Sequence, residues 1–189
     1  MSRSLYLSNS ELIEKSVANN ESELTHTGAL LSLTGNRTGR SPKDRYIVQE
    51  SSTKDKIEWG EVNRPFNSDH FDKLWDKVSA YLDDKDNYVS NVHVGSNKDH
   101  YIPVQIKSEL AWHSLFSRLI FISPESFNDE NKEVWKIVTA ANYVCDPEED
   151  HTNSESCVII NFLRRKVLIA GMKYAGEMKK SMFAVQNFL

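Results

Sequence analysis

The amino-acid sequence predicts an α/β (α+β) fold in which a mixed β-sheet is flanked by helices. Two pairs of apolar segments, each joined by a short polar turn, have the pattern of β-hairpins. Apolar residues recur at helical spacing between these pairs. Hairpins interleaved with helices indicate a mixed sheet, although the pattern does not give the direction of each strand. No repeat or Gly/Ser linker interrupts the 189 residues, so we expect one domain spanning 1–189.

The first quarter of the chain is predicted to contain a helix and two strands. Ser8 to Glu11 has the spacing of a capping box, and the apolar residues after it predict a short amphipathic helix. Gly28 to Leu33 has the composition of a buried strand. Residues 34–44 combine two glycines and a proline with small polar residues, which indicates a loop. Arg45 to Val48 resumes as strand, so we expect a strand–loop–strand unit here.

The remaining elements follow from the spacing of the apolar residues. From His70 to Leu82 the apolar side chains fall on one face of a helix. The other predicted elements are a hairpin of 89–94 and 101–106, a helix over 110–120, strands at 120–122 and 135–138, a hairpin of 158–162 and 167–169, and a helix at the end of the chain.

Composition excludes several classes of function. The 23 Lys and Arg against 27 Asp and Glu give a net charge of -4, which offers no general attraction to nucleic acid or to an anionic membrane. No apolar run approaches the length of a membrane span, and residues 1–20 lack the apolar core of a signal peptide. The expected compartment is therefore the cytosol. Cys145 and Cys157 are not in a metal-binding spacing, and we expect reduced, structural thiols.

The loop at 34–44, TGNRTGRSPKD, is the first candidate binding segment. Its glycines allow a ligand to approach the backbone, and Pro42 restricts the turn after Arg40. A guanidinium held in this way can bind a carboxylate or phosphate through two parallel hydrogen bonds. The alternative is a solvated surface loop in which Arg37, Arg40 and Lys43 face water. The local sequence slightly favours this alternative, because the motif matches no general phosphate-binding fingerprint.

The helix at the end of the chain is the second candidate. Met178, Met182, Val185 and Leu189 lie at helical spacing, flanked by Phe183 and Phe188, and predict an apolar anchoring face. Lys179 and Lys180 fall in the first turn, where the helix dipole disfavours cations and Glu177 offsets part of the cost. A bound phosphate or polyanion would reverse the sign of this arrangement. Two solvated lysines beside a balancing glutamate remain an equally open interpretation.

General catalytic motifs are not found in this sequence. Gly171 and Gly176 have the spacing of a P-loop, but Glu177 and Met178 follow where Lys and Ser or Thr are needed. The sequence contains no GxGxxG, HExxH or GxSxG motif. His113, at an aromatic-rich helical position, is interpreted as a hydrogen-bonded core histidine and not as a ligand.

At the level of longer motifs the chain resembles the ATP-dependent phosphoenolpyruvate carboxykinases. Two of the shared motifs, TGRSPKD at 38–44 and YAGEMKKS at 174–181, are long and particular to that family. The other shared segments, in the same order, are Tyr46-Ile47-Val48, Trp59-Gly60, Asn63-Arg64-Pro65, Trp112-His113 and Leu115-Phe116. The chain departs from the family pattern at Asn153, where arginine is usual, and at Ile102 or Gln105, near which an arginine is common.

The resemblance implies a reaction and a set of roles. Members convert oxaloacetate and ATP into phosphoenolpyruvate, carbon dioxide and ADP in gluconeogenesis, with Mn²⁺ or Mg²⁺ as the divalent metal. Arg40 would bind the substrate carboxylate, and Tyr174 would line the same pocket. Lys180 would bind manganese and substrate through a neutral amine, and Lys179 would stabilise the transferred phosphoryl group. A lysine can bind metal only if its pKa is lowered, and an adjacent ammonium group together with the metal favours the neutral form.

The resemblance also implies what these residues lack. The family's metal-binding histidine and aspartate, its P-loop and a further substrate arginine come after this helix, and none lies within 1–189. We therefore expect an amino-terminal, substrate-binding domain whose carboxy-terminal nucleotide-binding partner domain is absent, and which alone binds no cofactor and has no activity. Two alternatives stay open: a non-catalytic module that binds a dicarboxylate or phosphoenolpyruvate, and a remnant that self-associates through an exposed face.

Overall fold

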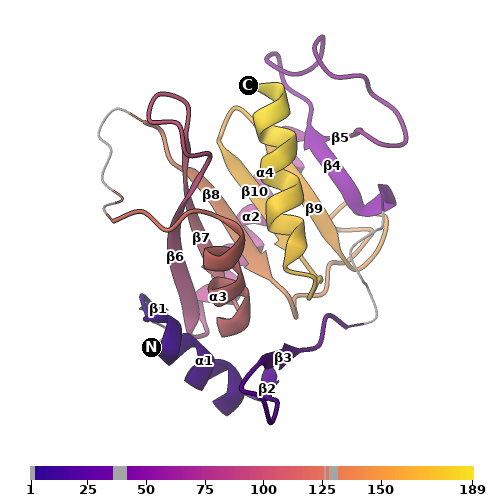
Figure 1. The fold of residues 1–189 in the computed structure, drawn as a ribbon. Coiled ribbons are helices and arrows are strands. Elements are labelled where there is room, and N and C mark those ends of the chain that lie inside the picture. Colours follow the sequence, from indigo (N-terminus) through magenta and orange to yellow (C-terminus); the bar gives the residue numbers. More distant parts are fainter. Residues whose placement is uncertain (1–2, 36–41, 126, 128–131) are drawn as a thin grey trace.

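The computed structural model describes residues 3–35, 42–125, 127 and 132–189, and within them a mixed sheet forms the centre of the fold (Figure 1). Eight of the described strands pair in the order β1-β6-β7-β8-β10-β9-β4-β5, and β2 pairs with β3 in a separate sheet. The strands are β1 (Ser4–Leu5), β2 (Ser22–Leu24), β3 (Leu30–Ser32), β4 (Arg45–Val48), β5 (Arg64–Phe66), β6 (Asn87–Val94), β7 (Ile102–Ser108), β8 (Trp135–Ala140), β9 (Cys157–Asn161) and β10 (Lys166–Ala170). The helices are α1 (Asn9–Ala18), α2 (Ser68–Asp83), α3 (Ala111–Ile120) and α4 (Gly176–Phe188), and Pro42–Asp44 is a short 3-10 turn.

The strand pairings confirm the predicted mixed sheet. Strand β6 pairs antiparallel with β7, and β9 pairs antiparallel with β10, so both predicted hairpins are present. The pairs β7–β8, β8–β10, β4–β9, β4–β5 and β1–β6 are parallel. Parallel strands need a crossover between them, and helices and long loops supply it here.

Alternate side chains of each strand are buried on opposite faces of the sheet. Along β10, Val167 and Ile169 belong to the core under α4, whereas Leu168 belongs to the core under α2. This division follows from the two-residue period of a strand. Helices α3 and α4 cover one face and α2 lies behind the other (Figure 1). The predicted apolar face of α2 is confirmed, because all five of its members are buried: Phe71, Leu74, Trp75, Val78 and Leu82.

The amino-terminal helix also forms as predicted. Ser8 caps α1 through its side chain, and the Glu11 side chain returns to the Ser8 backbone nitrogen at 2.7 Å, which completes the capping box. In the part of the chain that the structure describes, every helix is too short or too polar to cross a membrane.

Two predictions are wrong: the burial of the strand at 28–33, and the strand at 120–122. The segment 28–33 was expected to be buried, but β3 lies in the small sheet with β2, and Leu31 and Leu33 are 54% and 77% exposed. A run of apolar residues does not reveal whether the strand that it forms will pair inside the core or with a strand at the surface. Both strands of the predicted strand–loop–strand order form, but β3 and β4 belong to different sheets. At 120–122, Ile120 ends α3, and Ile122 makes only an isolated bridge to His93.

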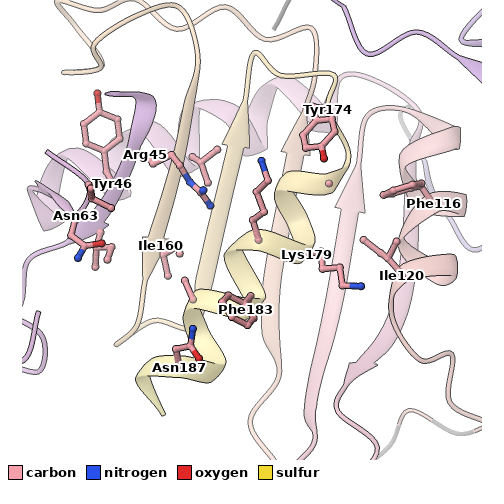
Figure 2. A pocket seen from close by; sticks show the side chains of 16 residues that line it. Arg45, Tyr46, Asn63, Phe116, Ile120, Ile160, Tyr174, Lys179, Phe183 and Asn187 are labelled. Atoms are coloured by element: carbon pink, nitrogen blue, oxygen red, sulfur yellow. The ribbon is translucent and has the colours of Figure 1, made fainter. Parts of the chain in front are cut away.

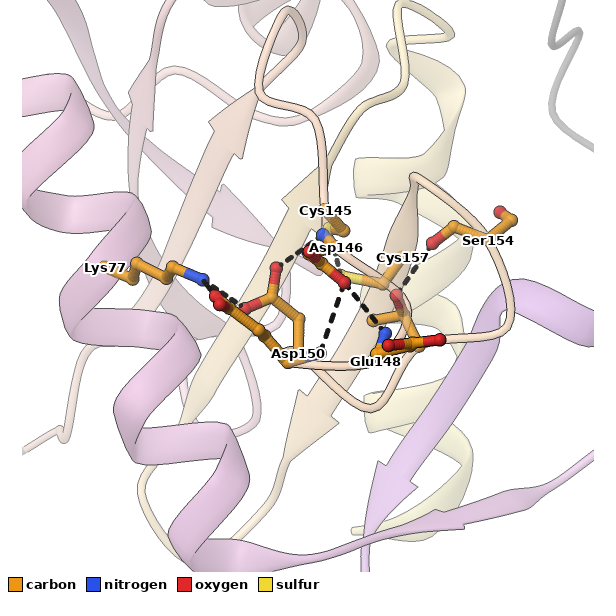
Figure 3. A network of polar contacts seen from close by, with 9 residues as sticks. Lys77, Cys145, Asp146, Glu148, Asp150, Ser154 and Cys157 are labelled. Atoms are coloured by element: carbon orange, nitrogen blue, oxygen red, sulfur yellow. Dashed lines mark hydrogen bonds and ion pairs between the residues drawn. The ribbon is translucent and has the colours of Figure 1, made fainter.

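The acidic stretch at 146–150 forms a turn that is attached to α2 (Figure 3). Asp150 accepts a hydrogen bond from the Asp146 backbone at 2.8 Å and another from Lys77 Nζ at 2.8 Å. The bonds to Asp150 and its neighbour Glu149 raise the pKa of Lys77 well above its usual range. Beside this turn Cys145 and Cys157 are free and buried, as predicted, with their sulfur atoms 3.8 Å apart. The hydrogen bond with the neighbouring Cys145 thiol, together with burial, raises the pKa of Cys157.

Candidate functional site

The candidate site is a pocket of about 850 Å³ along α4, lined from Gly176 to Asn187 of that helix. Its wall comes from β4, β9, α3 and α4 and is mostly apolar (Figure 2). Among the described residues that line it, the charged side chains are all cations: Arg45, Lys179 and Lys180. A concave wall with few polar groups and one sign of charge is suited to an anionic small molecule.

The backbone that leads into α4 depends on two glycines. Gly171 has φ +70°, and a Cβ there would lie 2.5 Å from the carbonyl oxygen of Glu155. A Cβ at Gly176 would lie 2.6 Å from the ring of Tyr174. Glycine at these positions therefore allows the loop to pass close to β9 and the Tyr174 ring to fold against the start of the helix.

The beginning of α4 is not capped by a side chain. Ala175 occupies the N-cap position with helical φ and ψ and makes no capping hydrogen bond. Backbone oxygens serve part of this first turn, because the Glu177 N–H donates to the Tyr174 oxygen at 3.3 Å and the Met178 N–H donates to the Ala175 oxygen at 3.2 Å. Glu177, in the first turn, supplies a negative charge there.

Glu177, which does not line the pocket itself, connects α4 with β4 through its contacts with two cations that do. Its side chain is 2% exposed, and its Oε1 accepts a hydrogen bond from Lys180 Nζ at 2.8 Å. Its Oε2 lies 3.5 Å from Arg45 Nη2. Lys180 Nζ also lies 4.8 Å from the centre of the Tyr174 ring, within the range of a cation–π contact. Lys180, Tyr174, Arg45 and Glu177 thus form one contiguous group.

Lys179 lies on the other side of the helix. It extends toward α3 on the side of Ile120, whereas Arg45 extends from β4 toward the opposite side of α4 (Figure 2). Lys179 is exposed and also lines a second cavity of about 280 Å³, together with His93 and Gln186. Adjacent helical residues differ in direction by about 100°, so the two lysines approach the pocket from different sides.

The glycine-rich loop is described at its two ends, residues 34–35 and 42–44. Arg37 and Arg40 lie outside the described residues. Lys43 is exposed, and its backbone oxygen accepts a hydrogen bond from Arg64 Nη1 at 2.5 Å. Because Arg45 follows two residues later and lines the pocket, the loop leads directly to the pocket wall.

A buried carboxylate fixes the end of this loop. Asp44 is 3% exposed and accepts hydrogen bonds from Ser154 Oγ at 2.8 Å and Asn153 Nδ2 at 3.2 Å. The Asn153 backbone donates to the Tyr46 hydroxyl at 2.7 Å, and burial raises the pKa of Tyr46. Asn153, where the resembling family usually has arginine, is thus a partner of the loop. Ile102 and Gln105 lie on β7, outside the pocket lining.

His113 is confirmed as a hydrogen-bonded core histidine. Its Nε2 lies 2.9 Å from the backbone oxygen of Lys173, and its Nδ1 lies 2.9 Å from Thr139 Oγ1. A carbonyl oxygen only accepts, so Nε2 carries the proton and Nδ1 accepts from the threonine. Complete burial lowers the pKa of His113 to about 4. The neutral ring holds the residue that precedes Tyr174.

The sequence did not point to several residues of this site. Arg45 and Asn63 line the pocket, as do Phe116 and Ile120 of α3. The alternation along β4 places Arg45 on the same face as Ile47, which packs on the α4 side of the sheet, but nothing local indicates that α4 lies there. Within the predicted apolar face of α4, Met178, Met182 and Val185 are buried, whereas Leu189 is 76% and Phe183 65% exposed.

The residues that the structure describes do not complete a metal site. No group of three His, Cys, Asp or Glu side chains among them is arranged to hold a metal ion. Lys180 offers one nitrogen, and that nitrogen donates to Glu177. A divalent cation would need most of its ligands from elsewhere, since Mn²⁺ and Mg²⁺ prefer about six, mostly oxygen, ligands.

Comparison with known proteins gives the chain a family. A family model described as phosphoenolpyruvate carboxykinase matches residues 4–189. The chain is 48% identical over 185 residues to a protein of Geobacillus kaustophilus (strain HTA426) named phosphoenolpyruvate carboxykinase (ATP). The aligned region covers 97% of this chain and 35% of that protein. It is 46% identical over 187 residues to a protein of the same name from Bacillus cereus (strain AH187), covering 98% of this chain and 35% of the relative. The chain spans about a third of the length of the relatives it matches, and it belongs to the phosphoenolpyruvate carboxykinase family.

Proposed function

We propose that residues 1–189 form the substrate-binding part of an ATP-dependent phosphoenolpyruvate carboxykinase. That enzyme converts oxaloacetate and ATP into phosphoenolpyruvate, carbon dioxide and ADP, a step of gluconeogenesis in the cytoplasm. The observation that carries the proposal is the pocket around α4, where the charged lining residues of the described chain are Arg45, Lys179 and Lys180. Oxaloacetate and phosphoenolpyruvate are both small polyanions, which such a pocket attracts.

The residue roles in this proposal follow the family motifs. Arg40 binds the substrate carboxylate, and Tyr174 lines the pocket for substrate and carbon dioxide. Lys180 contacts substrate from the side of Tyr174, and Lys179 stabilises the phosphoryl group from the other side of α4. Lys179 lines the cavity beside His93, whereas Lys180 lies against the Tyr174 ring, and these different surroundings support different roles for the two lysines. Phosphoryl transfer relies mainly on positioning and on such electrostatic stabilisation.

A divalent metal, Mn²⁺ or Mg²⁺, and ATP belong to the proposal for the whole enzyme. Bound metal would neutralise charge on the phosphate oxygens. Because this part of the chain offers Lys180 as a single candidate ligand, we assign no step of the reaction to the metal here. For the same reason the expected partner is a nucleotide-binding portion, for which the remaining length of the relatives leaves room.

A chimera tests the proposed activity. The matching third of the Geobacillus relative is replaced by residues 1–189, and oxaloacetate-dependent phosphoenolpyruvate formation is measured with ATP and Mn²⁺. We expect activity in the chimera, none in the isolated chain, and a loss of at least about 100-fold in the chimera with Lys180→Gln. A folded chimera without activity, or one that Lys180→Gln leaves unchanged, would contradict the proposal.

One alternative has specific support. Val62 and Phe183, which line the pocket, are 76% and 65% exposed, and exposed apolar side chains at a concave surface favour association. Self-association of the isolated chain through this face is measurable by sedimentation at increasing concentration. A strictly monomeric profile rejects it. The related alternative, a non-catalytic binding module, requires that the isolated chain binds phosphoenolpyruvate while the chimera is inactive.

A further inference from the structure

The proposed function leaves Glu177 without a role. It is the buried carboxylate at the start of α4, with a side chain only 2% exposed. Buried ionised groups are unfavourable unless they are paired and hydrogen-bonded. One oxygen is satisfied by Lys180 at 2.8 Å. The other lies 3.5 Å from Arg45 and accepts no hydrogen bond in the described part of the chain.

The contacts of Glu177 join two elements, α4 and β4. Lys180 comes from α4, and Arg45 is the first residue of β4. Both side chains are about one-third exposed and line the pocket, whereas Glu177 does not line it. The buried carboxylate of Glu177 therefore contacts both cations on the side that faces away from the pocket.

A purely structural ion pair accounts less well for this arrangement. Such a pair would satisfy both carboxylate oxygens, and it would match one cation to one anion. Here one carboxylate faces two cations and leaves an oxygen without a hydrogen bond. Both cations also line the pocket, where an anionic ligand could contact them. A local imbalance of this kind is typical of binding sites.

We infer that Glu177 is a positioning residue, which directs Lys180 and Arg45 toward a phosphate- or carboxylate-bearing ligand in the pocket. Glu177 does not touch the ligand and acts through the two cations. This inference rests on the proposed function, because it concerns the same pocket. It adds Arg45 to the side chains that face the substrate.

The sign of a mutational effect distinguishes positioning from net charge. Glu177→Gln keeps the size of the side chain and removes one negative charge. By long-range electrostatics alone, this change strengthens anion binding. If Glu177 positions the cations, the same change weakens binding because Lys180 and Arg45 lose their fixed directions.

Calorimetric titration of the chain with phosphoenolpyruvate provides the test. We expect Glu177→Gln to weaken binding by about tenfold or more, and Glu14→Gln, an exposed matched control on α1, to change it less than about twofold. Circular dichroism and thermal melting establish that each variant is folded. If Glu177→Gln does not fold, Glu177→Asp takes its place; it keeps the charge but shortens the reach, and the same weakening is expected.

A double-mutant cycle separates positioning from a general structural effect. If Glu177 acts through Lys180, the Glu177 substitution costs much less affinity when Lys180 is already methionine. Equal costs in both backgrounds, or unchanged or tighter binding by folded Glu177→Gln, overturn the inference while the proposed function stands. Absence of phosphoenolpyruvate binding by the unmodified chain counts first against the proposed function, and the inference falls with it.

Discussion

Helices α2 and α4 cover opposite faces of the same sheet and begin in opposite ways. The start of α2 is capped by Asn67, whose side chain accepts hydrogen bonds from the backbone of Asp69 and His70, and Asp69 in the first turn suits the helix dipole. The start of α4 has Ala175 at the N-cap and no capping side chain among the described residues; its first turn contains Glu177, and Lys179 and Lys180 follow directly. The comparison shows a capped start in the helix that packs against the core, and a start without a capping side chain among the described residues in the helix that lines the proposed site.

The largest expected contrast is in the aromatic residues of the two helices. Phe71 on α2 is 0% exposed and Phe183 on α4 is 65% exposed. We expect Phe71→Ala to lower the free energy of unfolding by about 3–5 kcal/mol, and Phe183→Ala to change it by less than about 0.5 kcal/mol. Urea denaturation measures both. A similar loss in the two variants would show that the exposed face of α4 is more tightly packed than this structure indicates.

The histidine beneath the loop to α4 should make stability depend on pH. Burial lowers the pKa of His113 from its usual 6.5 to about 4, so between these values the unfolded chain binds the proton more readily. The contribution of neutral His113 to the free energy of unfolding is therefore complete above about pH 6.5. It is lost as the pH falls toward 4, by up to about 3 kcal/mol.

Urea denaturation between pH 4 and 7 tests this expectation. His113→Gln should flatten the pH dependence, and His26→Gln, at an exposed histidine, should leave it unchanged. An unaltered slope in His113→Gln would contradict the assigned cause.

Two glycines provide a matched test of the loop that precedes α4. Gly171 and Gly28 both have positive φ, but a Cβ would meet the Glu155 oxygen at 2.5 Å at Gly171 and nothing within 4 Å at Gly28. We expect Gly171→Ala to destabilise the fold by about 2–3 kcal/mol and Gly28→Ala by about 1 kcal/mol. Thermal melting gives the difference. Equal losses would mean that φ alone, and not the close approach to β9, requires glycine at 171.

The smallest expected effect concerns the charge at the start of α4. Lys179 is exposed, with no ion-pair partner among the described residues. Lys179→Glu should stabilise the chain by about 0.3–1 kcal/mol at low salt, and less at physiological salt, because an anion suits the helix dipole. The same change should weaken phosphoenolpyruvate binding. Stabilisation without loss of binding would show that Lys179 is a solvated side chain and would remove it from the site.

Much of the fold could be predicted because its local patterns agree with its tertiary structure. The helical spacing of apolar residues predicted α2. The alternation of apolar and polar residues predicted the hairpins of β6 with β7 and of β9 with β10. The strand at 28–33 was predicted wrongly as buried, because burial depends on the partner that a strand finds. At 120–122 apolar composition suggested a strand where the chain leaves a helix and pairs with His93 at one position.

The site was predictable only in part for a similar reason. The motif YAGEMKKS identified Tyr174, Lys179 and Lys180, and all three line the pocket. Arg45 and Glu177 were not identified as a pair, because residues 132 positions apart meet only when α4 packs across β9 beside β4. Arg40 lies outside the described residues, so its role stays a prediction.

The sequence by itself determined the family, the type of each major element and the identity of the lysines, since these depend on residue order and local spacing. Only the tertiary structure decided which side of α4 each lysine faces and which carboxylate holds Lys180. It also placed Arg45 on the pocket wall. These features depend on how a helix is rotated against the sheet. That rotation is set by the packing of Met178, Met182 and Val185 over the core and not by the residues that carry the charge.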